Sequence, residues 1–448
     1  MSGTIMQSRL LAFILLLALP ATISATLQCD LTWQPPRTHP SKDPFYNVPA
    51  GYENASPGTI LKSRRPPSPL SAFAARPNKL EDSHQILYKT IDSLNQSTAT
   101  VATVLIPSNA DYGKVLSYQI AEDAATIDCA PSYGLQLPSA TDTVLGNMAT
   151  MAEILMIEAA LDQGWVVVVP DHQGPKGAFL ANELAAHSTL DGLRAALLSG
   201  NFTKIEADAT IALWGYSGGG LVSAWAAELH PVYAPELKIA GVAVGGIVPN
   251  ITTAITSMNK APYAGLIPSG IMGLYNQYPE FAQVVNQHLL PRYRPNLEKV
   301  TQQCASATVA QFFSDDITAI FDNPDLFHSD STFIEIFDAN ALGKRRPSAP
   351  LFVYKSVDDE ISPIQDTDVL VDFYCGKGVS VQYLRDLGST HESLGILGAP
   401  SALQWLRTVL HEEGRLEGCS RANVRSALLA PNATTLPYYI IDGLLGIL

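Results

Sequence analysis

The strongest candidate for chemistry in this chain is Ser217, which stands in the middle of GYSGG (215–219). This stretch matches G-x-S-x-G, in which a strand turns sharply into a helix and holds the serine in a strained backbone conformation that only small neighbours allow. The start of the helix also offers backbone N–H groups to a developing oxyanion. Because so short a pattern often arises by chance, the segments on either side decide whether it marks a nucleophile. TIALWG (210–215) predicts the strand and LVSAWAAELH (221–230) predicts the helix, so we interpret Ser217 as a nucleophile.

A serine nucleophile needs a base that takes its proton and an acid that orients the base. In folds built around this turn, the acid and then the base follow the serine, each after a later strand. The histidines beyond the helix that follows Ser217 are His288, His328, His391 and His411. The first two fall in a stretch without strands, and His411 lies in a helical pattern. His391, in LGSTHESLG, directly follows a predicted strand and is therefore the predicted base.

The acid is expected after the strand LFVYKS, where the chain reads VDDEISP (357–363). Asp358, Asp359 and Glu360 all compete for the role. We choose Asp359, because three residues separate it from Pro363 (Asp-x-x-x-Pro), which is the usual spacing after this strand in such folds. Asp358 is the second candidate, and an acidic surface turn would have the same composition.

Asp171 and His172, in VVVVPDHQGP, also end a predicted strand. They precede Ser217, which is the wrong chain order for the acid and the base. We therefore expect both side chains to pack below the pocket.

The elements that position these residues alternate between strands and helices. The apolar runs that predict strands are VLSYQI (115–120), WVVVVP (165–170), TIALWG (210–215), IAGVAVGG (239–246), LFVYKS (351–356) and VSVQYL (379–384). Before them, ILYKTIDSL and ATVATVLIP are separated by NQST, which predicts an antiparallel hairpin. This alternation predicts an α/β fold with a mostly parallel central sheet that helices cover on both faces.

One long interval interrupts this alternation. Residues 250–345 contain no convincing strand, and their apolar stretches are typical of short amphipathic helices broken by Pro and Gly. Because the strand pattern resumes afterwards, we expect a helical cap over the carboxyl edge of the sheet, where open α/β sheets bind ligands. A separate helical domain is the alternative.

The N-terminus carries a signal for secretion. The apolar core LLAFILLLALP is followed by the small residues ATISA, which predicts a signal peptide over 1–25 that is cut near Ala25. The core is too short for a membrane anchor. Asn-x-Ser/Thr sequons, which fit a secreted glycoprotein, occur at Asn54, Asn95, Asn201, Asn250 and Asn432.

Composition and charge exclude several classes of partner. The 448 residues are 47% hydrophobic and 16% charged, which provides ample material for a sizeable core. The formal net charge of −14 argues against nucleic acid and against anionic lipid headgroups as partners. No C-x-x-C or His/Cys cluster suggests a metal site, and we expect no metal and no cofactor.

Several stretches resemble, in the same order, the fungal secreted lipase family typified by Candida antarctica lipase A. They are SYQIAEDAATIDCAPSYGL (117–135), VVVPDHQGPKGAF (167–179), the GYSGGG turn (215–220), VDDEISP (357–363) and STHES (389–393). The resemblance covers most of the chain after about residue 80. It implies an α/β-hydrolase fold with a large helical cap or lid insertion and a C-terminal flap.

The expected organisation then follows from pattern and resemblance together. It comprises a signal peptide (1–25), an irregular N-terminal arm (26–80), a first part of the core (81–249), a cap or lid (250–345), and a second part of the core with the flap (346–448).

The resemblance also implies site residues. The oxyanion hole of the family implies the backbone N–H groups of Gly218 and Asp123, with Asp128 as a competing position, and the absence of an HGGG-type loop agrees with this. A bulky residue often precedes the Glu-Asp pair in the family, whereas this chain has Ala121 there. We therefore expect Ala121 to affect the shape of the acyl pocket.

Cysteine is present at five positions, Cys29, Cys129, Cys304, Cys375 and Cys419. Secretion favours disulfides, and an odd count leaves one thiol without a partner in the chain. The resemblance implies the pairs Cys129–Cys304 and Cys375–Cys419, which leaves Cys29.

The sequence and the resemblance together predict a secreted serine ester hydrolase. We expect a triacylglycerol lipase that releases fatty acids through Ser217, Asp359, His391 and an acyl-enzyme. Its partner is a neutral acyl ester, with transient contact to a lipid interface and no stable protein partner. The alternatives are a carboxylesterase or deacetylase for acylated fungal secondary metabolites of the trichothecene type, a secreted peptidase, and a non-catalytic binding protein on the same fold.

Overall fold

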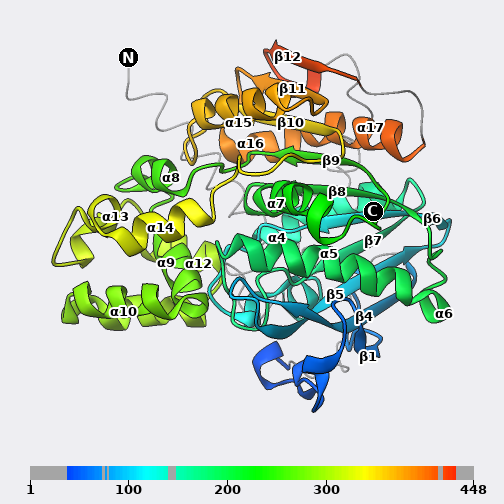
Figure 1. Cartoon of the computed structure of the whole chain (residues 1–448), viewed down its shortest axis with the longest axis horizontal. Coiled ribbons are helices and arrows are strands. Elements are labelled where there is room, and N and C mark those ends of the chain that lie inside the picture. The colour runs from blue at the N-terminus through cyan, green and yellow to red at the C-terminus, as the bar shows by residue number, and fades with distance from the viewer. Residues whose placement is uncertain (1–37, 73–75, 78–79, 140–147, 412–416, 430–448) are drawn as a thin grey trace, which may run out of the picture. The chain divides into compact units, whose positions relative to one another are not determined.

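The computed structural model describes residues 38–72, 76–77, 80–139, 148–411 and 417–429. The predicted signal peptide, Cys29 and Asn432 lie outside the described residues. The described part is built around one large sheet (Figure 1).

Among the described residues, ten strands form this sheet in the order β1-β4-β5-β7-β6-β8-β9-β10-β11-β12. Their bounds are β1 Ile60–Arg64, β4 Leu80–Ile91, β5 Ser97–Pro107, β6 Asp111–Gln119, β7 Trp165–Pro170, β8 Thr210–Tyr216, β9 Ile239–Gly245, β10 Leu351–Ser356, β11 Val381–Asp386 and β12 Cys419–Val424. Strands β4 and β5 form the antiparallel hairpin that the sequence predicted. From β7 to β12 all neighbours are parallel, so the mostly parallel sheet is confirmed. A separate short pair consists of β2 (Ser71–Ala72) and β3 (Arg76–Pro77).

The two outermost strands were not predicted. Strand β1 lies in the stretch that the sequence suggested was irregular, and it pairs with β4 in antiparallel orientation. Strand β12 pairs with β11, and five of its six residues are exposed. A sheet edge that is largely exposed needs no apolar run, because backbone hydrogen bonds to one neighbour hold it. The hydrophobic pattern therefore carries no signal for either edge.

Helices cover both faces of the sheet, as predicted. Helices α5 (Asn182–Leu198), α7 (Gly218–Tyr233) and α15 (Ile364–Gly376) pack on one face. Helices α4 (Met148–Leu161), α16 (His391–Leu397) and α17 (Ala399–Leu410) pack on the other.

Strand β7 explains why the central strands are apolar throughout. Val166 and Val168 contribute to the core on one face, and Val167 and Val169 contribute to the core on the other. A strand buried on both faces has no polar side, so its sequence is a continuous β-branched run.

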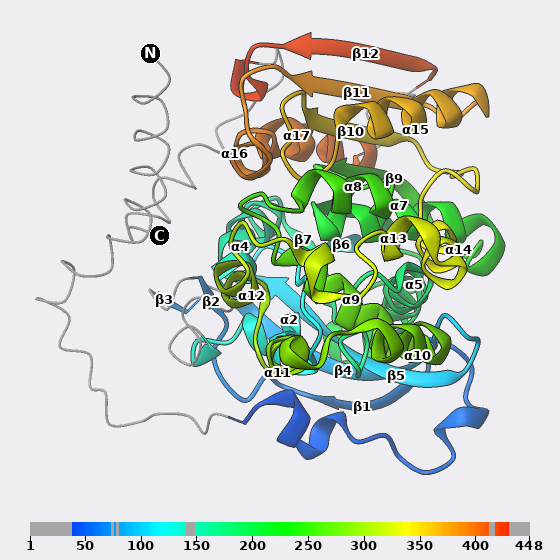
Figure 2. The ribbon, with the colours of Figure 1, turned by 90° about the vertical axis from the view of Figure 1, so that its left-hand side faces the viewer.

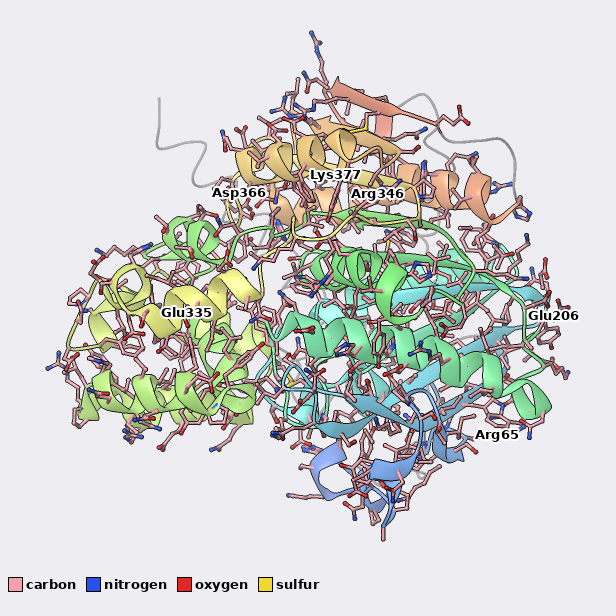
Figure 3. The ribbon with its side chains drawn as sticks, viewed as in Figure 1. Arg65, Glu206, Glu335, Arg346, Asp366 and Lys377 are labelled. Atoms are coloured by element: carbon pink, nitrogen blue, oxygen red, sulfur yellow. A yellow bond between two sulfur atoms is a disulfide. The ribbon has the colours of Figure 1, made fainter. Side chains whose placement is uncertain are left out.

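A helical insertion separates β9 from β10, and in Figure 2 it faces the viewer in front of the strands. It comprises α8 Ile251–Met258, α9 Leu266–Gln277, α10 Pro279–His288, α11 Arg294–Lys299, α12 Ala305–Gln311, α13 Leu326–Ser329 and α14 Ser331–Ala339. It has its own apolar core, in which the rings of Phe281 and Phe333 are 4.3 Å apart. Asp366, labelled in Figure 3 at the start of α15, accepts a hydrogen bond from Thr253 of α8 and so joins the insertion to the sheet's helices.

Short helices complete the described chain. They are α2 Pro131–Gly134 and α6 Gly200–Thr203, with the 3₁₀ turns η2 Pro40–Lys42, η3 Pro44–Tyr46, η4 Tyr52–Asn54, η5 Ile127–Cys129, η6 Pro291–Tyr293, η7 Val300–Gln302, η8 Ile317–Ile320 and η9 Ala427–Leu429. None of the helices in the described ranges is long and apolar enough to cross a membrane.

Two disulfides connect distant parts of the chain, with the pairing that the resemblance implied. Cys129, at the end of η5, is bonded to Cys304, which directly precedes α12 of the insertion. Cys375, near the end of α15, is bonded to Cys419 at the start of β12. The first bond links the helical insertion to a loop beside the carboxyl edge of the sheet, and the second secures the edge strand.

Candidate active site

Ser217 occupies a sharp turn between β8 and α7. Its backbone angles, φ of 52° and ψ of −121°, lie in a region that residues other than glycine rarely adopt. Its backbone N–H donates to the Gly245 carbonyl at 2.9 Å. A Cβ at Gly219 would lie 1.9 Å from the backbone oxygen of Gln119, and one at Gly215 would lie 2.3 Å from that of Gly219. The glycines of the motif are therefore required by close backbone approach, which is the steric reason inferred from the sequence.

His391 begins α16, five residues after β11 ends, and its side chain is buried between the other two predicted residues. Its Nε2 is 2.8 Å from Ser217 Oγ, and its Nδ1 is 2.7 Å from Asp359 Oδ2. The His391 N–H donates to Glu360 Oε2 at 2.9 Å, and the Tyr216 hydroxyl donates to the His391 carbonyl. These contacts hold the imidazole between a hydroxyl and a carboxylate.

Asp359 follows β10, and its side chain is fully buried. Its Oδ1 accepts from the backbone N–H groups of Ile361 and Ser362 at 2.9 and 2.8 Å. Its Oδ2 is 2.9 Å from Lys355 Nζ as well as close to His391. Burial acts to raise the pKa of Asp359, but His391, Lys355 and the Ser362 N–H hold that pKa well below its usual range. The carboxyl group is therefore ionised across the whole range of ordinary pH.

Within the described residues, the competing candidates form no hydrogen bond with the His391 ring. Asp358 is exposed, and Glu360 accepts from the His391 backbone rather than from its ring. His288 and His328 belong to α10 and α13 of the insertion, and His411 is exposed just after α17. Across the part of the chain that the structure describes, none of these five side chains forms a hydrogen bond with Ser217, whereas Asp359 and His391 form a continuous path to it.

Asp123, in the loop after β6, lies against the start of α7. Its φ is 47°, and a Cβ at Gly218 would lie 2.0 Å from Asp123 Oδ1. Burial raises the pKa of Asp123 to about 7, although His391 opposes the rise. With its amide oriented to satisfy both neighbours, Gln173 accepts from the Asp123 N–H at 3.0 Å and donates to Ala124. The backbone donor that the resemblance assigned to an oxyanion therefore already has a protein acceptor.

Asp171, His172 and Asp128, the other sequence candidates near this loop, have structural partners. Asp171 accepts from the N–H and hydroxyl of Ser132, and His172 Nε2 is 2.8 Å from the Ile120 carbonyl, with both side chains buried. Asp128, the competing oxyanion position, accepts from the N–H and hydroxyl of Ser41.

An apolar cavity opens beside Ser217. It encloses roughly 580 Å³ that includes some open solvent, and Asp123, Ser217 and Gly218 contribute to its wall. The rest of the wall is almost entirely hydrocarbon and comes largely from α8, α9 and α14 of the insertion, with Ile255, Met258, Ile267 and Phe337 among the lining residues. The arrangement can hold an apolar chain next to a hydroxyl that has a base within hydrogen-bonding distance.

Sequence reasoning missed two contacts of this site. Glu360 was considered only as an alternative acid, and its contact with the His391 backbone depends on how two loops meet. Lys355 was not considered, although a signal was present: it is a charged residue inside the otherwise apolar strand LFVYKS.

The buried carboxyl groups around the Asp123 loop make stability depend on pH. Burial raises the pKa of Glu153 to about 8 and that of Asp171 to about 7, as for Asp123. The unfolded pKa of such groups is about 4, so between about pH 4 and 8 the folded state binds more protons and its stability falls as pH rises. Buried His172 and His187, with pKa values lowered to about 4, act in the opposite sense, but only below about pH 6.5. Stability should therefore fall from about pH 6.5 to about pH 8.

Glu153→Gln tests this expectation. Glu153 accepts from the Ala121 N–H and the Tyr118 hydroxyl, both at 2.9 Å, and a neutral amide can keep this geometry. Over this pH range, we expect the free energy of unfolding to fall by about 1–2 kcal/mol less in the variant than in the wild type, as measured by urea unfolding. The control is Glu335→Gln on α14, an exposed carboxylate labelled in Figure 3. If the free energy of unfolding depended on pH equally in all three proteins, the assignment of the pH dependence to Glu153 would be contradicted.

The mostly parallel sheet, its helical layers and the strained serine after β8 define an α/β-hydrolase. A solved structure of Candida antarctica lipase A in its closed state is similar to the chain with a TM-score of 0.80 and 27% sequence identity, covering 91% of this chain and 95% of that one.

The chain belongs to the secretory lipase family, whose model matches residues 135–418. It is 47% identical over 413 residues to Lipase A of Arthroderma benhamiae, covering 91% of this chain and 88% of that protein. It is 38% identical over 418 residues to Lipase 1 of Candida albicans, with the same coverage. The chain is thus a carboxylic ester hydrolase of the lipase class, and membership in this family agrees with the expected secretion.

Proposed function

We propose that the chain is a secreted triacylglycerol lipase that works through Ser217, His391 and Asp359. The observation that carries the proposal is the continuous contact from Ser217 Oγ to His391 Nε2 at 2.8 Å and from His391 Nδ1 to Asp359 Oδ2 at 2.7 Å. His391 takes the serine proton as Oγ attacks the ester carbonyl. Asp359 keeps the Nδ1–H tautomer and stabilises the imidazolium that forms.

In this mechanism, the carbonyl oxygen on which negative charge develops lies at the start of α7. The Gly218 N–H points from the first residue of this helix and is our first oxyanion donor. Asp123 is the second donor, and its N–H has to be shared between the Gln173 amide and the oxyanion. Loss of the alcohol leaves an acyl-enzyme, which water, activated by His391, then hydrolyses.

The cavity wall supports a substrate with an acyl chain. Its lining is hydrocarbon except near Ser217, which matches a fatty acyl group whose single polar end is the reacting ester. The several relatives that bear the name lipase support the same substrate class. The helical insertion between β9 and β10, which supplies much of this wall, takes the role of the cap (250–345) between the two parts of the core (81–249 and 346–448).

The proposal also includes secretion. Cleavage of the signal peptide (1–25) would leave an enzyme that begins with the N-terminal arm (26–80) and carries two disulfides suited to an oxidising compartment. The enzyme would act at the surface of lipid droplets, so that its activity rises when the ester substrate forms an emulsion.

A substitution in the cavity wall tests the acyl-chain assignment. Ala254 is a small buried residue of α8 that lines the cavity, and Ala254→Phe fills part of the space. We expect at least a tenfold loss of kcat/KM on emulsified triolein but less than a threefold change on a short acetate ester, because only the long chain needs that space.

Thr256→Phe is the matched control, since Thr256 is exposed on the same helix. It should leave both rates near those of the wild type. A wild-type enzyme that hydrolyses only the acetate ester would instead favour a deacetylase, and equal losses on both substrates in Ala254→Phe would contradict acyl binding in this cavity.

A further inference from the structure

A lysine side chain is fully buried beside the proposed acid. Lys355 lies in β10, four residues before Asp359, and none of its side chain is exposed. Its Nζ is 2.9 Å from Asp359 Oδ2 and donates to the Ile247 carbonyl, also at 2.9 Å. A buried ammonium group is costly unless it is paired and hydrogen-bonded. These two partners therefore account for how the strand tolerates the charge.

The lysine and the histidine share one carboxylate oxygen. Asp359 Oδ2 lies close to both Lys355 Nζ and His391 Nδ1, while Oδ1 accepts from the backbone N–H groups of Ile361 and Ser362. Each carboxylate oxygen of Asp359 thus has two polar partners, which together fix the plane of the carboxylate. Its negative charge is divided between an ammonium group and an imidazole.

The charged and titratable groups that face this pair from the surrounding elements are otherwise acids and tyrosines. They are Asp123 after β6, Tyr216 of β8, Tyr263 between α8 and α9, and Glu360 and Asp366 after β10. Asp386 of β11 and Glu392 of α16 act on Tyr216 and Tyr263 respectively. Burial keeps the two tyrosines protonated, so the negative charge around the pair comes from the acids. Among the described residues around the pair, Lys355 supplies a positive charge against them.

We propose that Lys355 is a positioning residue that holds the Asp359 carboxylate against His391 and, through its positive charge, extends the activity to more acidic pH, an inference that rests on the catalytic roles proposed above. An ammonium 2.9 Å from the carboxylate offsets part of its negative charge. It also prevents Oδ2 from turning away from Nδ1 when the site is empty. The lipase consequently remains active in a more acidic medium than the same three catalytic residues would allow alone.

Lys355→Met tests this proposal, because methionine keeps most of the side-chain length and removes the charge. The measurement is kcat/KM for a soluble p-nitrophenyl ester from about pH 4 to about pH 9. We expect the acid limb of the profile to move to higher pH by about one unit, while the rate on the plateau falls by less than about tenfold. Lys355→Arg, which keeps the charge, should have its acid limb where the wild type has it.

The matched control is Lys89→Met. Lys89 is a buried lysine of β4, and five strands of the sheet separate β4 from β10, so the control removes a buried cation far from the site. Its acid limb should coincide with that of the wild type. If Lys355→Met does not fold, Lys355→Gln supplies the same comparison with a polar neutral side chain.

Two results would overturn the proposal. An acid limb that stays in place in the neutral variants, with a rate lowered equally at every pH, would show that Lys355 only supports the structure. Failure of both neutral variants to fold, with a folded Lys355→Arg, would likewise make the ion pair a requirement of folding. Either result is distinct from failure of the proposed function, in which Ser217→Ala would retain activity in the wild-type background.

Discussion

Replacement of Ser217 by alanine should lower kcat on esters by roughly 10⁶-fold and leave the fold intact. In the proposed mechanism the hydroxyl oxygen is the atom that attacks, and it is also the partner that His391 Nε2 approaches at 2.8 Å. Alanine keeps the Cβ that already fits the strained backbone of the turn, so the unfolding temperature should change little. The measurement is hydrolysis of a p-nitrophenyl ester together with labelling by a fluorophosphonate probe, which the variant should lose completely.

Ser269→Ala is the matched control for this experiment. Ser269 is a fully buried serine of α9, beside the cavity-lining Gly270, and its hydroxyl has no hydrogen-bond partner within the part of the chain that the structure describes. Its removal should leave hydrolysis and labelling near the wild-type level. Persistent labelling or hydrolysis in Ser217→Ala would assign the chemistry to another residue.

Asp359→Asn should lower kcat by about 10⁴-fold. The amide places a neutral group against His391 Nδ1, so the wrong tautomer of the imidazole is favoured and the imidazolium loses its counter-charge. The same change leaves the buried Lys355 without an anionic partner, and we also expect a lower unfolding temperature. Activity has to be measured well below that temperature, so that lost chemistry is not confused with lost structure.

Asp358→Asn separates the two neighbouring acids. Asp358 is exposed, so its amide variant should retain activity within about twofold and unfold at nearly the wild-type temperature. The opposite pattern, with activity lost in Asp358→Asn and kept in Asp359→Asn, would reverse the choice that the Asp-x-x-x-Pro spacing suggested.

The core of the fold could be predicted because its signals are local. The continuous β-branched run of β7 predicts a strand buried on both faces, and GYSGG between an apolar strand and a helix predicts the turn at Ser217. The chain order of serine, acid and base then selected Asp359 and His391, because each had to follow a later strand. The structure brings these three side chains together.

What could not be predicted depends on contacts between residues far apart in the sequence. The edge strands β1 and β12 lack an apolar run, because they are held by backbone pairing rather than by burial on both faces. Gln173 lies beside the Asp123 N–H through the meeting of two loops, and no pattern around either residue indicates it. The pKa of Asp123 likewise follows from burial, which a loop sequence does not reveal.

The Cys129–Cys304 bond has a consequence for engineering the enzyme. The helical insertion joins the rest of the molecule through the peptide chain at both of its ends and through this third, covalent attachment. A chimaera that receives the insertion of another lipase must therefore receive a cysteine at the position of Cys304, or the graft will lack one of its three anchors. Since Cys129 lies only six positions after Asp123 along the chain, production in a reducing host would also leave the segment that carries Asp123 without its covalent link to the insertion.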